Sequence, residues 1–400
     1  INGVADRFER EGADAWFAED AAGLLPPGTA CPRCKARDFD KERDILDVWF
    51  DSGVSFAAVL EKNEKLAYPA DMYLEGSDQH RGWFHSALLT SVETRNRAPY
   101  KSVLTHGFVV DGKGEKMAKS KQNVIAPEEV IKRYGVEVLR LWVASEDYRE
   151  DITISDEILK RLSESYRKIR NTCRFLLGNL HDFTPARAVE YEHLAEIDRW
   201  ALHRLHQLAA KVTAAYADCE FHTIYHLLHN FCVTDLSAVY LDVLKDNLYC
   251  SLPAGASRKA SQTAFHIILT SLIKLMAPLL PFTADEMWGF LPADVSREES
   301  VHLSPFPQLD GRYVDDTLHE KWQLLFQVRN RALKVLEEKR AEKLLGNALE
   351  AEVILEAPEQ LFNLLHDNHA VLEDLFIVSR VTLRRESGGE DVSAEAGLDR

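Results

Sequence analysis

Residues 70–95 read ADMYLEGSDQHRGWFHSALLTSVETR, and residues 101–110 read KSVLTHGFVV. The first stretch predicts a strand over 71–75 that stops at Gly76 and Ser77 and passes into a helix. The second predicts another strand, because it is apolar and rich in β-branched residues. A strand, a loop, a helix and a strand in this order build a parallel sheet, whose ligands bind beyond the carboxyl ends of the strands. The two stretches therefore predict an α/β domain with a ligand crevice at Glu75–His80 and His106–Phe108.

Two flanking segments belong to the same prediction. Residues 44–53 (DILDVWFDSG) predict a short apolar strand whose polar end brings Trp49–Gly53 to the crevice. Residues 111–127 (DGKGEKMAKSKQNVIAP) predict an exposed loop, in which four lysines stand among glycines: Lys113, Lys116, Lys119 and Lys121. Such a loop suits a polyanion, because lysine is a flexible point charge and glycine lets backbone N–H groups approach phosphate oxygens. A solvated surface hairpin is the alternative.

Polar and aromatic side chains at the strand ends are the first candidates for ligand contact. Glu75, Asp78 and Gln79 place carboxylate and amide groups there, which suit a ribose or an ammonium group. Each candidate also fits a structural role. Asp78 follows Gly-Ser and could cap its helix, while Trp49 and Trp83 could be core aromatics.

The composition is that of a soluble protein of two or three domains. Hydrophobic residues make up 46% of the 400 residues and charged residues 28%. We find neither an apolar run of ~18 residues nor a signal peptide, and we expect a cytoplasmic protein without membrane contact. The net charge of −16 argues against indiscriminate binding of nucleic acid but leaves room for local basic stripes. The chain opens on Ile1, and none of its four methionines lies near the start, which predicts a segment of a longer protein.

Two groups of residues have metal-ligand spacing. Cys31 and Cys34 form a Cys-x-x-Cys knuckle, which is half of a tetrahedral zinc site; the other half would lie outside this chain, or the pair is free. Cys219, His222, His226 and His229 share one helical stripe, but a single stripe on one helix cannot surround an ion. We expect these histidines to be partly buried or to face RNA.

The periodicity changes to 3.6 residues after residue 155. A core stripe is predicted on the first helix at Ile158, Leu162, Ile169, Cys173 and Leu176. Another face of the same helix carries Lys160, Arg167, Arg170 and Arg174, which fits either a solvated surface or RNA backbone contact. Residues 311–400 predict a long helix, a strand (351–357), a helix, a strand (376–383) and a polar tail.

Four blocks resemble successive motifs of the bacterial-type isoleucyl-tRNA synthetases, a class I aminoacyl-tRNA synthetase family: LDVWFDSG (46–53), LEGSDQHRGWF (74–84), THGFVVDGKGEKMAKS (105–120) and YGVEVLRLWVAS (134–145). The resemblance implies a remnant of the editing insertion over 1–45 and the second half of a Rossmann-like catalytic domain over 46–155. It further implies an all-α anticodon-binding bundle over 156–310 and a small α+β junction over 311–400. The implied reaction is the activation of isoleucine by ATP, with Mg²⁺, and its transfer to tRNA(Ile). We expect a monomer, with Zn²⁺ in the full-length protein.

The resemblance also implies residue roles. Lys116, Lys119 and Ser120 would act on the phosphates. The adenylate would contact a larger set, with Glu75 and Gly76 at its amino acid portion, Asp78 and Gln79 at the ribose, His106, Gly107 and Phe108 at the adenine, and Trp49 and Trp83 as walls of the apolar pocket. The basic face at Lys160, Arg167, Arg170 and Arg174 would contact tRNA.

Departures from the family pattern limit these expectations. Ala118 stands where the family has serine, and Lys121-Gln122 replaces Leu-Gly. None of the 15 histidines belongs to a His-x-Gly-His motif, which in class I synthetases contacts ATP phosphates. We therefore expect half an active site, which is inactive by itself. A valyl-tRNA synthetase fragment and a non-catalytic RNA-binding paralogue are the alternatives.

Overall fold

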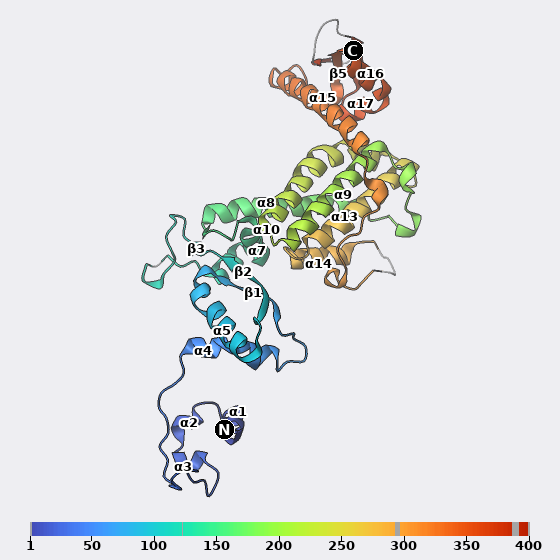
Figure 1. Cartoon of the computed structure of the whole chain (residues 1–400). Helices are drawn as coiled ribbons and strands as arrows, with labels where there is room; N and C mark the ends of the chain where they lie inside the picture. Colours follow the sequence, from blue (N-terminus) through green and yellow to red (C-terminus); the bar gives the residue numbers. More distant parts are fainter. Residues whose placement is uncertain (1, 122, 293–296, 386–391, 399–400) are drawn as a thin grey trace. The chain divides into compact units, whose positions relative to one another are not determined.

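The computed structural model describes residues 2–121, 123–292, 297–385 and 392–398 (Figure 1). The chain divides between His106 and Gly107 into two compact units, and each is described by itself. Among the described helices, none is long and apolar enough to cross a membrane.

The first unit contains a small parallel sheet. Strand β1 (Ala70–Gly76) pairs in parallel with β2 (Tyr100–His106), and a 3-10 turn, η2 (Ser77–Arg81), and helix α5 (Trp83–Arg95) connect them. This order confirms the predicted strand, loop, helix and strand. Short helices precede it: α1 (Asn2–Glu11), α2 (Ala15–Ala18), α3 (Ala21–Leu24), α4 (Val48–Gly53) and the π-helical turn η1 (Phe56–Leu60).

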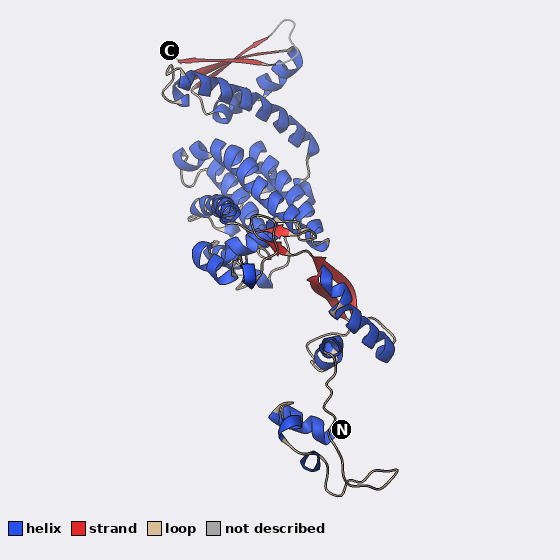
Figure 2. Ribbon diagram, turned by 90° about the vertical axis from the view of Figure 1, so that its left-hand side faces the viewer, coloured by secondary structure: helices blue, strands red, loops and turns tan. Residues whose placement is uncertain are grey.

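Helix α5 packs on one face of this sheet (Figure 2), where Tyr73, Phe84 and Ala87 form a core cluster. The opposite face is open. Met72 and Leu74 on β1 are 41% and 53% exposed. In the described part of the chain, β1 and β2 pair only with each other. Two strands with one covered face are marginally stable by themselves.

The strand predicted over 44–53 is wrong, because Val48–Gly53 form helix α4. The Asp47 carboxylate accepts a hydrogen bond from the Trp49 N–H (2.8 Å) and caps the first turn. The segment before it joins no described sheet. A short apolar run without a strand partner becomes helical once a good N-cap precedes it.

The second unit begins with a pair of two-residue strands. β3 (Val109–Val110) pairs in parallel with β4 (Ile152–Thr153). The predicted second strand is therefore split at Gly107 and Phe108. A Cβ atom on Gly107 would lie only 2.3 Å from the carbonyl oxygen of Glu150, so this approach requires glycine. Residues 147–155, which precede the helical bundle, contribute β4, which the sequence did not predict.

Between β3 and β4 the chain forms the 3-10 turn η3 (Lys119–Lys121) and the helices α6 (Pro127–Tyr134) and α7 (Val136–Ser145). Helix α6 begins at Pro127, with Glu128 and Glu129 in its first turn. Gly135, whose φ of +89° lies in the region that favours glycine, separates α6 from α7.

A helical bundle follows, as predicted. Its elements are α8 (Asp156–Gly178), η4 (Pro185–Arg187), η5 (Tyr191–His193), α9 (Glu196–Ala217), α10 (Phe221–Asn230), the π-helix η6 (Phe231–Tyr240), α11 (Leu241–Val243), α12 (Lys245–Cys250), α13 (Ala256–Met276), α14 (Pro281–Phe290) and η7 (Val301–Leu303). The predicted core stripe of α8 is buried at Leu162, Ile169, Cys173 and Leu176, and half-buried at Ile158.

The last part of the second unit is α+β, as predicted. It contains η8 (Gly311–Tyr313), the long helix α15 (Asp316–Ala341), η9 (Ala348–Glu350), β5 (Ala351–Ala357), α16 (Glu359–Asp367), α17 (His369–Phe376), β6 (Arg380–Arg385) and β7 (Ser393–Leu398). The three strands form a sheet of order β6-β5-β7.

Two details of this region differ from the prediction. The last predicted strand begins only at Arg380, because Leu372, Leu375 and Phe376 are completely buried on helix α17. The predicted polar tail contains β7, which pairs antiparallel with β5. Residues 386–391, 399 and 400 of that tail lie outside the described residues.

Candidate functional site

The carboxyl ends of the two strands in the first unit meet at one edge of the sheet. Glu75 pairs with Thr105 and Gly76 pairs with His106, so the candidates on both strands share this edge. Glu75 and Asp78 are exposed there. The edge offers an accessible carboxylate from β1 and another from the following turn, as the sequence predicted.

Gln79 organises the turn after β1. Its Oε1 atom accepts a hydrogen bond from the Trp83 N–H (2.9 Å), and its Nε2 atom donates to Asp78 Oδ2 (3.1 Å). A Cβ atom on Gly82 would lie 2.8 Å from the Trp49 ring, so the indole approaches the backbone only because residue 82 is glycine. Trp49 remains 45% exposed. The turn thus presents an apolar ring beside a carboxylate–amide pair.

Trp83 has structural partners of its own. Its ring stacks on Tyr73 with the centroids 4.0 Å apart, and its Nε1 atom donates to Ser55 Oγ (3.1 Å). It is half-buried and belongs to the core cluster that joins α5 to the sheet. Its predicted role as a pocket wall stays a prediction.

Gly107 and Phe108, two of the residues predicted to contact adenine, have their backbone N–H groups bonded within the second unit. The Gly107 N–H donates to the carbonyl oxygen of Tyr148 (2.8 Å). The Phe108 N–H donates to Asp151 Oδ1 (2.7 Å). An adenine contact through these two N–H groups would therefore replace an existing hydrogen bond, and the prediction is untested.

The lysine loop is a compact hairpin whose turn is built on Asp111. The Asp111 N–H donates to the carbonyl oxygen of Glu115 (2.9 Å), and Val110 forms an antiparallel bridge with Lys116. The carboxylate Oδ1 of Asp111 accepts from the N–H groups of Lys113 (2.9 Å) and Glu115 (3.0 Å). A hydrogen bond from Asn123 and those two N–H groups lower the pKa of Asp111 below its usual value.

Asn123 is a functional candidate that the sequence reasoning missed. Its Nδ2 atom donates to Asp111 Oδ2 (2.9 Å), while its Oδ1 atom accepts from the Ala118 N–H (2.9 Å). The same Nδ2 atom lies 3.4 Å from the carbonyl oxygen of Lys116. The signal available in the sequence was an asparagine shortly after a glycine-rich loop, a residue type that often bonds to nearby backbone groups.

The lysines of the hairpin differ in their surroundings. The Lys116 ammonium lies 4.0 Å from the centroid of the Phe108 ring, and its side chain is otherwise exposed. Lys121 pairs with Glu115 (2.9 Å), so this extra cation, absent from the family pattern, is balanced locally. The side chain of Lys119 lies outside the described residues, and Ser120 is exposed.

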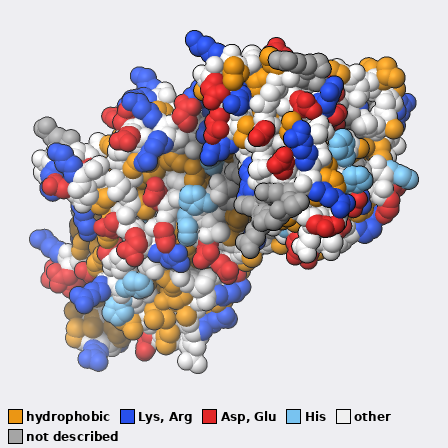
Figure 3. Space-filling model, turned by 90° about the horizontal axis from the view of Figure 1, so that it is seen from above, with side chains coloured by type: hydrophobic (Ala, Val, Ile, Leu, Met, Phe, Trp, Pro, Cys, Tyr) orange, Lys and Arg blue, Asp and Glu red, His pale blue; other side chains and the backbone are white. Residues whose placement is uncertain are grey.

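The predicted tRNA-binding face of α8 is partly neutralised. Arg170 makes a bidentate ion pair with Glu286 of α14 (2.7 and 2.9 Å). Lys160 pairs with Asp156 (2.8 Å), and Arg167 pairs with Glu164. Arg174 is exposed and makes no ion pair with a described residue. Acidic and basic side chains are likewise intermixed on the face shown in Figure 3.

Cys31 and Cys34 lie in a turn closed by a hydrogen bond from the Cys31 N–H to the carbonyl oxygen of Ala36 (2.8 Å). Hydrogen bonds from the N–H groups of Cys34 and Arg33 lower the pKa of the Cys31 thiol. The turn thus favours a thiolate. In the part of the chain that the structure describes, no group of three or more histidine, cysteine and acidic side chains could hold a metal ion.

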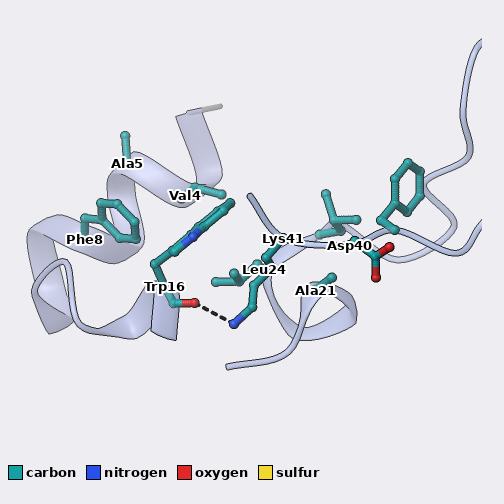
Figure 4. Close-up of a pocket in the computed structure, with 10 residues that line it drawn as sticks. Val4, Ala5, Phe8, Trp16, Ala21, Leu24, Asp40 and Lys41 are labelled. Atoms are coloured by element: carbon teal, nitrogen blue, oxygen red, sulfur yellow. Dashed lines mark hydrogen bonds between the residues drawn. The ribbon is translucent and has the colours of Figure 1, made fainter. Parts of the chain in front are cut away.

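An apolar cavity of about 450 Å³ lies among the short helices of the first unit (Figure 4). Phe8 and Trp16 line it, and the Lys41 ammonium donates a hydrogen bond to the carbonyl oxygen of Trp16 (2.6 Å). None of the predicted site residues lines this cavity.

Comparison with protein families gives two matches. Residues 1–155 match the model of "tRNA synthetases class I (I, L, M and V)". Residues 198–355 match the model of the "Anticodon-binding domain of tRNA ligase".

The curated relatives are much longer than this chain. An isoleucine–tRNA ligase of Geobacter sulfurreducens is 54% identical over 393 residues, which are 98% of this chain and 42% of the relative. One of Syntrophotalea carbinolica is 56% identical over 382 residues, which are 95% of this chain and 41% of the relative. The chain therefore spans less than half the length of the relatives it matches.

Two solved structures share the fold. The ternary complex of Agrobacterium radiobacter LeuRS, tRNA and LeuAMS superimposes with a TM-score of 0.56 at 17% identity, covering 93% of this chain and 44% of that chain. Mycobacterium tuberculosis methionyl-tRNA synthetase with methionyl-adenylate gives a TM-score of 0.51 at 18% identity, covering 60% of this chain and 49% of that chain.

Proposed function

We propose that the chain belongs to the class I tRNA synthetases of the I, L, M and V group and is the lysine-loop and anticodon-binding part of an isoleucine–tRNA ligase. The observation that carries the proposal is the 54% identity to such a ligase over 98% of the chain. Valine specificity is not favoured, because the relatives described above are isoleucine ligases at 54% and 56% identity. A non-catalytic paralogue is not favoured for the same reason.

In the proposed reaction the carboxylate of isoleucine attacks the α-phosphate of ATP, which forms isoleucyl-adenylate and releases pyrophosphate. Negative charge develops on the departing phosphates, and fixed cations placed there stabilise the transition state. Lys116 and Lys119, with the hydroxyl of Ser120, are our candidates for this role. The hydrogen bonds of Asp111 and Asn123 support it, because they give the exposed Lys116 a defined backbone.

The first unit would hold the amino acid and the ribose. Glu75 is an exposed carboxylate at the strand end and would pair with the ammonium group of isoleucine. Asp78 and Gln79 would bond the ribose hydroxyls, and Trp49 would cover the aliphatic side chain. An apolar pocket separates isoleucine from valine by only ~1–3 kcal/mol, since one methylene distinguishes them.

The proposed ligase would bind Mg²⁺ and Zn²⁺ in different ways. Mg²⁺ would arrive with ATP, since the described residues contain no cluster of three or more metal-ligating side chains. Zn²⁺ needs four ligands, and Cys31 and Cys34 supply two, with hydrogen bonds that favour the thiolate of Cys31. The residues of this chain thus fit half of a zinc site, and we assign zinc no step in the reaction.

The bundle would bind tRNA(Ile). Arg174 is the strongest candidate on α8, because it is the exposed cation of the predicted face without an ion pair among the described residues. The ligase would act as a monomer in the cytoplasm. Its remaining part would cover the open face of the β1–β2 sheet, where Met72 and Leu74 are exposed.

A segment exchange tests the proposal. The aligned part of this chain would replace the matching segment of the Geobacter sulfurreducens ligase, and aminoacylation of tRNA(Ile) would be measured. We expect isoleucylation within about tenfold of the parent ligase and little valylation after correction for editing. The matched control carries Lys116→Ala. A chimera that folds and binds ATP but does not aminoacylate would contradict the proposal.

A further inference from the structure

We infer that Asn123 and Asp111 form a latch that positions the lysine loop for phosphate binding. The latch is the hydrogen bond between the Asn123 carboxamide and the Asp111 carboxylate, together with the bond from the Ala118 N–H to Asn123. This inference rests on the proposed function, because it names positioning residues for that reaction. Neither residue is proposed to touch the substrate.

The latch joins two parts of the loop that are separate in sequence. Asp111 lies at the base of the hairpin, where its Oδ1 atom already accepts two backbone N–H groups. Its second oxygen, Oδ2, accepts from Asn123, which lies beyond the last lysine. One carboxylate therefore holds the hairpin turn with one oxygen and the end of the loop with the other.

The Asn123 amide also contacts the backbone between the two proposed catalytic lysines. Its Oδ1 atom accepts from the N–H of Ala118, and its Nδ2 atom lies near the carbonyl oxygen of Lys116. Met117, between these contacts, accepts from the Ile125 N–H through its sulfur (3.3 Å). The peptide units next to Lys116 thus have side-chain partners on the far side of the loop, which limits the directions its ammonium can take.

The ion pair of Glu115 with Lys121 spans the same loop but differs in kind. Both side chains are more than half exposed, at 56% and 53%. Exposed pairs of this kind contribute little, because water and salt screen them. Asp111 and Asn123 are half-buried, and each makes several directed bonds to backbone groups. Glu115 therefore provides a matched control within the same hairpin.

Exchanging the two partners tests the latch without removing either functional group. Asn123→Asp sets a second carboxylate against Asp111, so the donor is lost and like charges face each other. Adding Asp111→Asn restores one donor and one acceptor in reverse order, since the asparagine oxygen can still accept the Lys113 and Glu115 N–H groups. If Asn123 acted without the hydrogen bond to Asp111, the second substitution would not reverse the effect of the first.

The first measurement is deuterium uptake of peptides covering residues 109–125 in the full 400-residue chain. We expect Asn123→Asp to speed the uptake about tenfold and the double exchange to return it to within about threefold of the unmodified chain. Glu115→Gln should change it less than about twofold. Unchanged uptake in peptides of α8 and α13 would show that the bundle is intact. The inference is wrong if Asn123→Asp leaves the deuterium uptake unchanged, or if the double exchange does not reverse its effect.

The second measurement is isoleucine-dependent ATP–pyrophosphate exchange in the chimeric ligase. Asn123→Asp should lower kcat about tenfold with the KM for isoleucine unchanged, and the double exchange should recover most of it. If uptake responds but kcat does not, the latch has no positioning role and the inference is wrong. If the unmodified chimera is inactive while the uptake result holds, the proposed function fails and the positioning role fails with it.

Discussion

Asp198 is a buried carboxylate whose replacement should change how the bundle responds to pH. The side chain is completely buried where α9, η6 and α13 meet. It accepts hydrogen bonds from Tyr240 OH (2.6 Å) and from Ser261 Oγ (3.4 Å). Burial raises its pKa from 3.8 to about 6, because the charged form loses its water. Asp198→Asn removes the charge and keeps an oxygen that can accept from Tyr240.

The sign and size of the effect follow from linkage. Because the folded pKa lies above the unfolded value, the protonated carboxyl contributes stability below about pH 4, and this contribution is lost as the pH rises through about 6. At ~1.4 kcal/mol per pKa unit, the shift corresponds to about 3 kcal/mol at pH 7.5, roughly half of that at pH 5 and little at pH 4. The unmodified chain loses this free energy of unfolding as the pH rises, whereas Asp198→Asn does not. The difference between the two chains should therefore grow by these amounts, in addition to a contribution of the substitution that does not depend on pH.

Urea unfolding followed by far-UV circular dichroism at pH 4.5, 5.5, 6.5 and 7.5 measures this difference. The contributions of the other carboxylates to the pH dependence cancel in this difference, because both chains contain them. Asp218→Asn, at the exposed end of the same helix, is the matched control and should show the pH dependence of the unmodified chain. A constant difference across the four pH values would refute the assignment of a raised pKa to Asp198.

Four further substitutions give distinct outcomes. Gly107→Ala should lower Tm, with a cost of about 1–3 kcal/mol, because the added Cβ would lie 2.3 Å from a backbone oxygen; an unchanged Tm would contradict the close approach. Arg174→Ala should weaken tRNA(Ile) binding and reduce the salt slope by about one, whereas Arg170→Ala should mainly lower Tm, and equal effects on binding would count against the distinction. Lys116→Ala in the chimera should lower kcat for pyrophosphate exchange about 100-fold at constant isoleucine KM, and a change in KM alone would show that its role is different.

Local patterns predicted those elements whose cause is local. The strand, glycine-serine break and helix of residues 70–95 were predicted because polarity and turn residues change within a few positions. The helix at Val48–Gly53 was missed, since a short apolar run fits a strand or a helix equally and the Asp47 cap decides between them. Strand β7 was missed because Ala394 and Ala396 are small and stand among polar residues, so only pairing with β5 reveals it.

Contacts between distant residues explain what the sequence did not reveal about the candidate site. The strand break at Gly107 depends on the backbone of Glu150, and the neutralisation of Arg170 depends on Glu286 on another helix. The lysine loop was identified from its composition and the roles of Lys116 and Lys119 from the family resemblance, but the role of Asn123 depends on which backbone groups its amide reaches. Charge and flexibility are visible in a sequence, whereas hydrogen-bond partners across a folded loop are not.

The central claim is tested most directly by isoleucine-dependent ATP–pyrophosphate exchange, measured on the 400-residue chain alone and on the chimera that restores the remainder of a ligase. The account predicts no exchange by the chain alone, which has no His-x-Gly-His motif in its 400 residues, and isoleucine-dependent exchange by the chimera. Exchange by the chain alone, or a chimera that prefers valine, would contradict it.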